Sequence, residues 1–194
     1  MPAITRDSLM SLEQYARERP TFRKRVLAHK QNRSLALGKH LTLLFEDELT
    51  IRYQIQEMLR IEKIFEEDGI EGELEAYNPL VPDGSNFKAT LLIEYPDFEE
   101  RRYMLTHLKG IEDAIWVQVE GCERIFAIAD EDLERENDEK TSAVHFLRFE
   151  LTPEMQRQLK GGAPLGIGAS HPEYAAEIPA IPESLRLSLL TDLA

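Results

Sequence analysis

Helical periodicity is clearest in residues 48–67. When successive residues are placed about 100° apart, apolar side chains gather on one face and polar side chains on another. The main apolar face is made by residues at helical spacing: Ile51, Ile55, Met58, Leu59 and Phe65. Glu62 falls near the middle of this face, and Glu57 lies on a mixed side between Tyr53 and Ile61. A helix with apolar residues on more than one side is usually covered by other elements. The pattern therefore predicts a central helix with carboxylates embedded among apolar residues.

The chain before this helix is predicted to be mostly helical. Asp7 or Ser8 can cap a first helix, which Pro20 is expected to end near Arg19. A second helix is predicted from residue 21, with Gly38 as its stop. The apolar run at residues 40–46 is either a buried strand or the lead-in to the central helix, because periodicity does not separate the two.

After residue 85 the pattern changes from helical to extended. Strands are predicted at residues 88–95, 100–108, 114–120, 123–129, 142–151 and 163–170. Residues 100–108 are expected to pair with 88–95 as a hairpin, and Gly121-Cys122 is expected to form a tight turn. Residues 171–174 are expected to turn away from the last strand. Shorter helices are predicted at 70–77, after Pro153 and after Pro182.

These elements predict an α+β fold. The N-terminal helical half is expected to pack on a mostly antiparallel β-sheet or small sandwich, with a C-terminal helix. A chain of 194 residues is long enough for one domain with a substantial core. We therefore expect a single domain over residues 1–194, helical over about 1–80 and β-rich over about 86–194.

Composition narrows the class of protein. The net charge of -13 argues against a general binder of nucleic acid or of anionic membranes. The N-terminus has no apolar core of a signal peptide, and no apolar run approaches the length of a membrane span. Cys122 is the only cysteine, so one chain forms no disulfide framework and no multi-cysteine metal site. These features predict a cytoplasmic protein; its oligomeric state is left open.

Charge is distributed unevenly along the chain. Residues 17–39 contain eight Lys or Arg with Glu18 as the only acid, whereas residues 46–75 contain eleven acids and three bases. The basic stretch either contacts a phosphate or nucleic acid or packs beside the acidic helix and neutralises it. The closeness of two segments of opposite sign favours neutralisation.

The embedded carboxylates are the main candidates for chemistry. A buried carboxylate must be paired, protonated or bound to a cation. Arg52, Arg60 or an arginine elsewhere could satisfy it, and the helix edge could leave it hydrated. If neither holds, the sequence predicts a ligand pocket beside the central helix. Its lining is predicted to be Tyr53, Gln54, Glu57, Arg60, Glu46, Tyr77, Asn78 and His171.

A metal site at this pocket would have to assemble from distant residues, because the five histidines show no metal-ligand spacing. The predicted ligands are Glu57, Glu62, His40 and His171, for iron, zinc or manganese. A second hypothesis is an enzyme in which Glu57 or Glu62 acts as a general base with a pKa raised by burial. Gly166 and Gly168 are not followed by a helix, so they do not predict a phosphate cradle.

Several segments carry a resemblance to a known family. The segments YQIQEM (53–58) and AYNPL (76–80) are the most specific, and others extend over almost the whole chain. The chain resembles the bacterial domain-of-unknown-function family numbered three-five-zero-one. No activity is established for that family, so the resemblance transfers no catalytic residues. Its relatives are often encoded near rubrerythrin-like proteins and iron–sulfur proteins similar to heterodisulfide-reductase subunits, which implies a redox or metal-handling context.

Because the chain has neither a cysteine cluster nor a di-iron motif, we expect an accessory of such proteins and not the redox carrier. The leading hypothesis is a cytoplasmic accessory or binding protein that holds a metal or small ligand beside the central helix. A third hypothesis is a protein-interaction module without a ligand. Its docking surfaces would be the basic segment 17–39 and the acidic loop 130–140.

Overall fold

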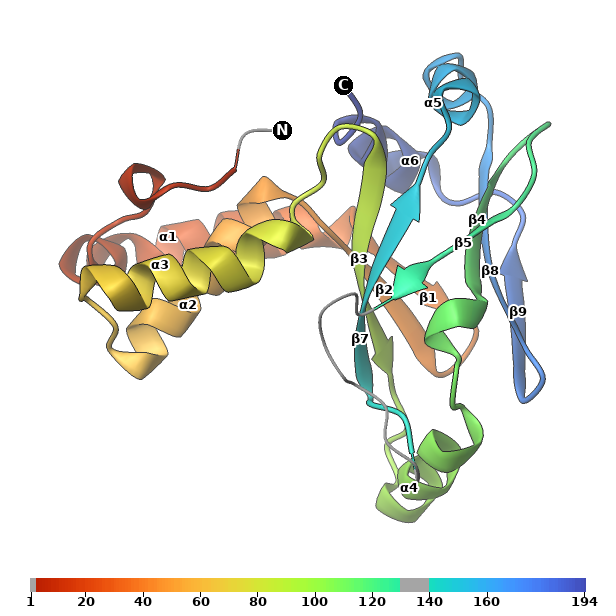
Figure 1. The fold of residues 1–194 in the computed structure, drawn as a ribbon, viewed down its shortest axis with the longest axis horizontal. Helices are drawn as coiled ribbons and strands as arrows, with labels where there is room; N and C mark the ends of the chain where they lie inside the picture. The colour runs from red at the N-terminus through yellow and green to blue at the C-terminus, as the bar shows by residue number, and fades with distance from the viewer. Residues whose placement is uncertain (1–2, 130–139) are drawn as a thin grey trace.

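The computed structural model describes residues 3–129 and 140–194. Three helices project from one side of a β-rich unit (Figure 1). We call the projecting part the helical arm; its helices are α1 (Leu12–Gln31), α2 (Glu48–Glu62) and α3 (Glu67–Tyr77). Short 3-10 turns lie at each end of the arm's sequence, at η1 (Arg6–Ser8) and η2 (Asn78–Leu80). The rest of the described chain is called the β-body.

The β-body contains two antiparallel sheets. One has the order β1-β2-β3-β7-β6, with β1 (Ser34–Leu37), β2 (Leu41–Glu46), β3 (Asn86–Ile93), β7 (Val144–Glu150) and β6 (Ile128–Ala129). The other has the order β5-β4-β8-β9, with β5 (Ile125–Phe126), β4 (Ile115–Val119), β8 (Leu165–His171) and β9 (Tyr174–Ile178). Around the sheets lie η3 (Glu112–Ala114), α4 (Phe98–His107), α5 (Pro153–Lys160) and α6 (Glu183–Leu190). The fold is α+β with a C-terminal helix, as predicted.

One hydrophobic core joins the two sheets. Inward residues alternate along each strand, as in Leu41, Leu43 and Phe45 of β2. They share a continuous apolar cluster with Val117 of β4 and Ile167 of β8. Each fully buried side chain of this size contributes about 1.5–3 kcal/mol from burial. The β-body is therefore held by its own core, separate from that of the arm.

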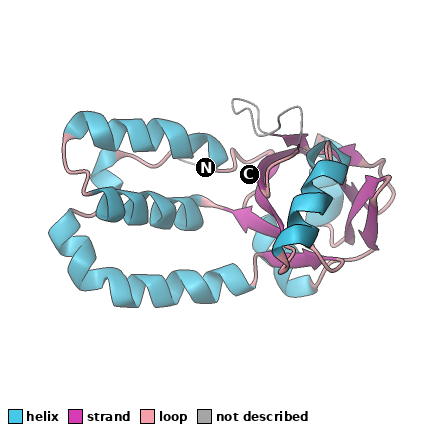
Figure 2. Ribbon diagram, turned by 90° about the horizontal axis from the view of Figure 1, so that it is seen from below, coloured by secondary structure: helices cyan, strands magenta, loops and turns pink. Residues whose placement is uncertain are grey.

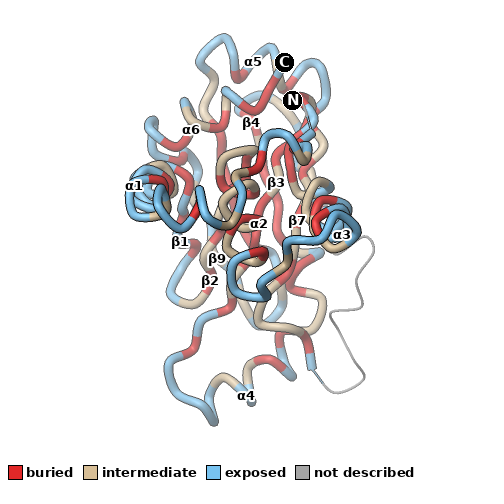
Figure 3. The backbone as a smooth tube through the Cα atoms, turned by 90° about the vertical axis from the view of Figure 1, so that its left-hand side faces the viewer, coloured by how far each residue is buried: buried red, intermediate tan, exposed pale blue. Residues whose placement is uncertain are grey.

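The arm is one helix thick, with α2 between α1 and α3 (Figure 2). On one side α2 shares an apolar cluster with α3, in which Ile55 and Leu59 meet Ile70 and Leu74. On the other side, Tyr15, Phe22 and Val26 of α1 pack beside Tyr53 of α2. Each outer helix buries one face against α2 and leaves the opposite face exposed (Figure 3). Among the described residues, no helix combines the length and the apolar character needed to cross a membrane.

The prediction that Pro20 ends a first helix is wrong. α1 runs through Pro20, and the side chain of Ser11 caps it by accepting a hydrogen bond from the Gln14 backbone N–H at 3.2 Å. Proline removes one helical hydrogen bond. Buried Tyr15 and Phe22 lie on either side of Pro20 and pack in the same cluster, so contacts with α2 keep the helix continuous.

The prediction that a second helix continues to Gly38 is also wrong. Residues 34–37 form β1, in which Leu35 and Leu37 are buried at alternating positions. Gly38 (φ 74°) lies in the turn between β1 and β2, where positive φ suits glycine. The apolar run that periodicity left open is strand β2. Two strands of the β-body therefore lie within the part of the chain predicted to be helical.

Residues 100–108 are not a strand, because the chain forms α4 there. The Asp97 side chain caps this helix by accepting from the Glu100 backbone N–H at 2.8 Å. β3 is paired on both edges, with β2 and with β7, so no edge remains for a hairpin partner. The chain turns at residues 172–173, and strand β9, which follows and was not predicted, pairs with β8. The strand predicted at residues 123–129 is divided into β5 and β6, which belong to different sheets. The remaining predicted strands and the helices α3, α5 and α6 are present.

Candidate functional site

Glu57 of α2 is held by an internal ion pair. Arg19 of α1 donates from Nε to Oε1 at 2.7 Å and from Nη2 to Oε2 at 2.8 Å. The Tyr15 hydroxyl donates to Oε1 at 2.6 Å. The hydrogen bonds from Arg19, aided by Tyr15, lower the pKa of Glu57 to about 2, against the opposing effect of burial. This direction is opposite to the raised pKa that a general base would need.

The other residues predicted on this side of α2 also lie near α1 or in solvent. Arg60 Nε is 3.7 Å from Glu57 Oε1, and its side chain is exposed. The ring of Tyr53 packs against Phe22 of α1 at a centroid distance of 6.0 Å. Gln54 is half-buried. These four positions of α2 thus contribute to one surface of the arm and to its contact with α1.

The remaining predicted lining residues lie elsewhere. Glu46 is buried at the end of β2, where Thr50 and Thr90 donate to its carboxylate at 2.5 and 2.8 Å. The Asn78 side chain holds the N-terminal segment through the backbone N–H and C=O of Ile4, at 2.8 and 2.9 Å. Tyr77 packs against the cluster between α2 and α3. His171 belongs to the β-body, with Nε2 2.9 Å from the carbonyl of Lys109.

The four predicted metal ligands have separate surroundings. Glu57 is paired with Arg19, and the ring of His40 stacks on Tyr95 at 3.9 Å. Glu62 is exposed and does not lie within an apolar face, because α2 ends at that residue. Lys63 then adopts the left-handed conformation (φ 57°) and redirects the chain. The described residues contain no group of three or more His, Cys, Asp or Glu that could hold a metal ion. Ligand binding by the predicted lining residues stays a prediction.

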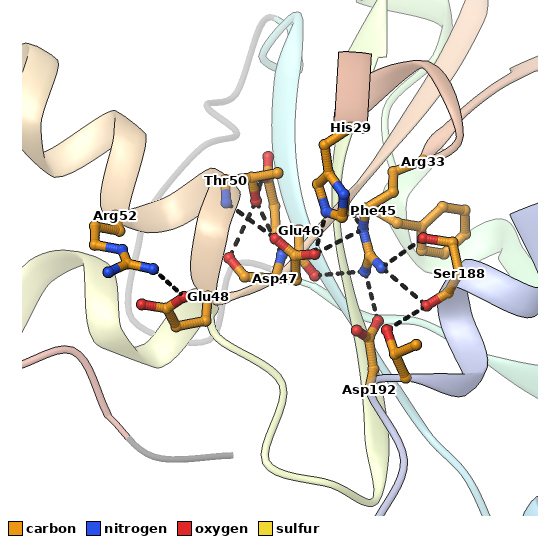
Figure 4. A network of polar contacts seen from close by, with 11 residues as sticks. His29, Arg33, Phe45, Glu46, Asp47, Glu48, Thr50, Arg52, Ser188 and Asp192 are labelled. Carbon is orange, nitrogen blue, oxygen red and sulfur yellow. Dashed lines mark hydrogen bonds and ion pairs between the residues drawn. The ribbon is translucent and has the colours of Figure 1, made fainter. Parts of the chain in front are cut away.

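The arm joins the β-body through a buried polar network (Figure 4). Arg33, which follows α1, is 1% exposed and donates to the carbonyls of Phe45 and Glu46 at 2.9 and 3.0 Å. It also donates to the Ser188 carbonyl and hydroxyl at 3.2 Å and to Asp192 Oδ2 at 2.5 Å. One guanidinium thus links the end of α1, the end of β2 and the C-terminal helix.

Two carboxylates in this network respond differently to their surroundings. Burial raises the pKa of Asp47, but the charge of Arg33, the Thr50 N–H and His29 together hold it below its usual range. His29 Nε2 lies 2.5 Å from Asp47 Oδ2, and the same carboxylate caps α2. For Asp192, burial raises the pKa to about 6 against the opposing effect of Arg33. The pKa values of both junction carboxylates therefore depend on the charge of Arg33.

The sequence gives a local signal for only one member of this network. Arg33 is one of eight bases in its stretch, and its partner Asp192 is 159 residues away. Asp47 is the one member with a local signature, since it precedes a helix at a capping position.

The far end of the arm exposes apolar side chains. Ile61 is 61% exposed and Phe65 is 70% exposed, at and just after the end of α2. Phe65 lines an open hollow of about 300 Å³ together with Met10, Leu12 and Ile64. We call Ile61, Phe65 and this hollow the arm tip. The end of α2 and the start of α3 lie at the end of the arm that is farthest from the β-body (Figure 1).

Comparison with known proteins gives a family and a close structural relative. The model of the family described as "Protein of unknown function (DUF3501)" matches residues 3–193. A crystal structure of a protein of unknown function from Burkholderia pseudomallei K96243 is 57% identical, covers 100% of both chains and has a TM-score of 0.95. No curated protein matches. The chain therefore belongs to the DUF3501 family.

Proposed function

We propose that the chain is an accessory protein that docks onto a partner protein through the arm tip. The observation that carries this proposal is the exposure of Phe65, which lines an open hollow at the end of a projecting arm, and of Ile61 four residues before it. Large apolar side chains gathered at one exposed place are typical of interaction surfaces. Aromatic side chains in such places often supply much of the binding energy.

The contacts of Glu57 favour docking over ligand binding or catalysis beside α2. Both carboxylate oxygens already accept charge-assisted hydrogen bonds from Arg19, and Oε1 also accepts from Tyr15. A metal or a substrate proton would have to compete with these bonds. The arginine also keeps the carboxylate in its weakly basic, ionised form.

The choice of partner comes from the resemblance alone. Rubrerythrin-like proteins and iron–sulfur proteins are implied as neighbours, so an accessory role in a redox context makes them the first partners to test. The predicted acidic docking loop lies outside the described residues, apart from Lys140. The variants that test the proposal are therefore made at the arm tip.

Affinity capture from an extract of the native host, with quantitative mass spectrometry, tests the proposal. The baits are the wild-type chain, the Ile61→Ser/Phe65→Ser variant and the control variant Leu187→Ser. Leu187 is 52% exposed on α6 and gives an apolar-to-polar change on the β-body. We expect the tip variant to lose at least about 90% of a specific partner, corresponding to about 1.4 kcal/mol, while the control keeps it. Equal capture by all three baits would contradict the proposal.

A further inference from the structure

The outer face of α1 carries positive charge that the described part of the chain does not neutralise. Of the six Lys and Arg in α1, Arg19 pairs with Glu57, and Lys30 Nζ lies 6.0 Å from the centroid of the Tyr53 ring. The other four are exposed and form no ion pair or hydrogen bond with described residues: Arg17, Arg23, Lys24 and Arg25. We call these four the basic face. Within residues 17–39, Arg19 pairs with Glu57 and Arg33 lies 3.5 Å from Asp47, so the predicted neutralisation by the acidic segment holds for these two bases and not for the basic face.

Charge is separated across the width of the arm. α1 has six bases and two acids, whereas α3 has five acids and no base. Packed helix axes lie about 8–10 Å apart, so α2 separates α1 from α3 by about 16–20 Å. This exceeds the screening length of about 8 Å at physiological salt. The acids of α3 therefore leave the basic face available to an external anion.

An apolar side chain lies within the charged region. Leu27 is 45% exposed and follows Arg23 and Lys24 by four and three residues. At this spacing the three side chains are neighbours on the helix surface. A partner that pairs with the two cations can also cover Leu27.

From this arrangement we infer that the basic face docks an acidic amphipathic helix of a partner protein. This inference rests on the proposed docking role of the arm and specifies the chemistry of the partner. α1 has 20 residues and is about 30 Å long, which matches a partner helix of several turns. Apolar residues of that helix would cover Leu27, and its flanking carboxylates would pair with Arg23 and Lys24.

A nucleic acid fits the same surface less well. The chain as a whole carries a charge of -13, and a long polyanion would extend from α1 toward the acidic remainder of the molecule. A single helix with its acids on one face can confine its charge to α1.

Fluorescence anisotropy tests the inference with two labelled probes. One is a synthetic helix of about 18 residues, long enough to be partly helical in water, with a leucine stripe at i, i+4 spacing, glutamates beside that stripe and alanines on the far face. The other is a short duplex DNA. The proteins compared are the wild-type chain, Arg23→Glu/Lys24→Glu, Leu27→Ser and the control Arg102→Glu/Arg157→Glu. The control reverses two exposed charges on helices of the β-body.

We expect Arg23→Glu/Lys24→Glu to weaken peptide binding at least about tenfold, equivalent to about 1.4 kcal/mol, and Leu27→Ser to weaken it less. The control should bind as the wild type does, and added salt should weaken binding. Failure of the wild type to bind the peptide would overturn the inference. So would unchanged binding by Arg23→Glu/Lys24→Glu, or tighter binding to DNA that this variant abolishes.

The arm-tip variant separates this inference from the proposed function. If Ile61→Ser/Phe65→Ser keeps the peptide and Arg23→Glu/Lys24→Glu loses it, the basic face is a docking surface whatever the affinity capture finds for the tip. If the tip variant loses the peptide and Arg23→Glu/Lys24→Glu keeps it, the tip is the docking surface and the inference about α1 is wrong.

Discussion

The helical arm and its junction with the β-body each contain an arginine–carboxylate pair. The pKa of the carboxylate is lowered in the arm and raised at the junction. In the arm, contact with Arg19 lowers the pKa of Glu57 to about 2. At the junction, burial raises the pKa of Asp192 to about 6 although Arg33 Nη2 lies 2.5 Å away. A close arginine therefore does not by itself fix the protonation of its partner.

Solvation and hydrogen-bond supply explain the difference. The Glu57 side chain is 14% exposed, and donors serve both of its oxygens. The Asp192 side chain is 1% exposed, and its Oδ1 has no hydrogen-bond partner among the described residues. The negative charge of Asp47 nearby raises the pKa of Asp192 further. The arm pair is thus partly solvated and has hydrogen bonds to both carboxylate oxygens, whereas the buried junction pair depends on its few surrounding contacts.

The largest effect expected from this comparison is that of removing Arg33. Arg33→Met leaves Asp192 and the carbonyls of Phe45 and Glu46 without their donor in a buried place. We expect a loss of about 3–5 kcal/mol in the free energy of unfolding, typical of breaking a buried pair. Urea denaturation measures it, and Arg23→Met on the exposed face of α1 is the matched control. A similar small loss in both variants would contradict the role of the junction.

The pH dependence of stability distinguishes the two carboxylates. Asp192 has a folded-state pKa of about 6, above its ordinary value of 3.8, so the folded chain binds this proton more tightly. Its contribution is fully present below about pH 3.8 and is lost as pH rises through 6. As pH rises through that range, the wild-type chain should lose about 1–3 kcal/mol in the free energy of unfolding from this group, and Asp192→Asn should not show that loss. Denaturation of both proteins from pH 4.5 to 7.5 measures it, and parallel pH profiles would refute this assignment.

Glu57 is expected to show the opposite dependence. Its folded-state pKa is about 2, below its ordinary value of 4.5, so its contribution to stability is present above pH 4.5 and is lost as pH falls toward 2. Glu57→Gln should lower the melting temperature at pH 7 by less than Arg33→Met does, because Arg19 can return to solvent. The difference from the wild type should shrink on acidification. A difference that grows instead would show that Glu57 is not held in its ionised form.

The smallest effect concerns the turn beside the arm tip. Lys63 has φ 57°, the only non-glycine positive φ among the described residues. Glycine adopts this conformation without a steric penalty, so Lys63→Gly should stabilise the chain by about 0.5–1 kcal/mol. Glu62→Gly, one residue earlier within α2, should destabilise it by about 1 kcal/mol. Thermal denaturation of the two variants compares the signs, and equal signs would contradict the assigned turn.

Local patterns predicted much of the fold. Periodicity located α2 and α3, and alternation located β3 and β7, because each element buries a regular face. The failures arose where tertiary contacts decide. Packing against α2 keeps α1 helical across Pro20. Both edges of β3 are already paired, so residues 100–108 cannot pair with it as a strand. No local pattern shows either fact.

The candidate site was predicted in part. Glu57 was expected to be either paired with an arginine or part of a ligand site, and the structure pairs it with Arg19 from another helix. The Arg33–Asp192 pair joins opposite ends of the sequence, which no spacing rule connects. The arm tip was not predicted, because Phe65 fits the apolar pattern of the central helix and was expected to be buried. In the structure α2 ends before Phe65, which is exposed.

Affinity capture with a Glu57→Gln bait beside the Ile61→Ser/Phe65→Ser bait tests most directly whether the arm acts through its surface and not through its carboxylate. We predict that the Glu57→Gln bait retains the specific partner of the wild-type chain, because that carboxylate is satisfied internally, and that the tip bait loses it. Loss of the partner from a folded Glu57→Gln bait, with retention by the tip bait, would contradict the account.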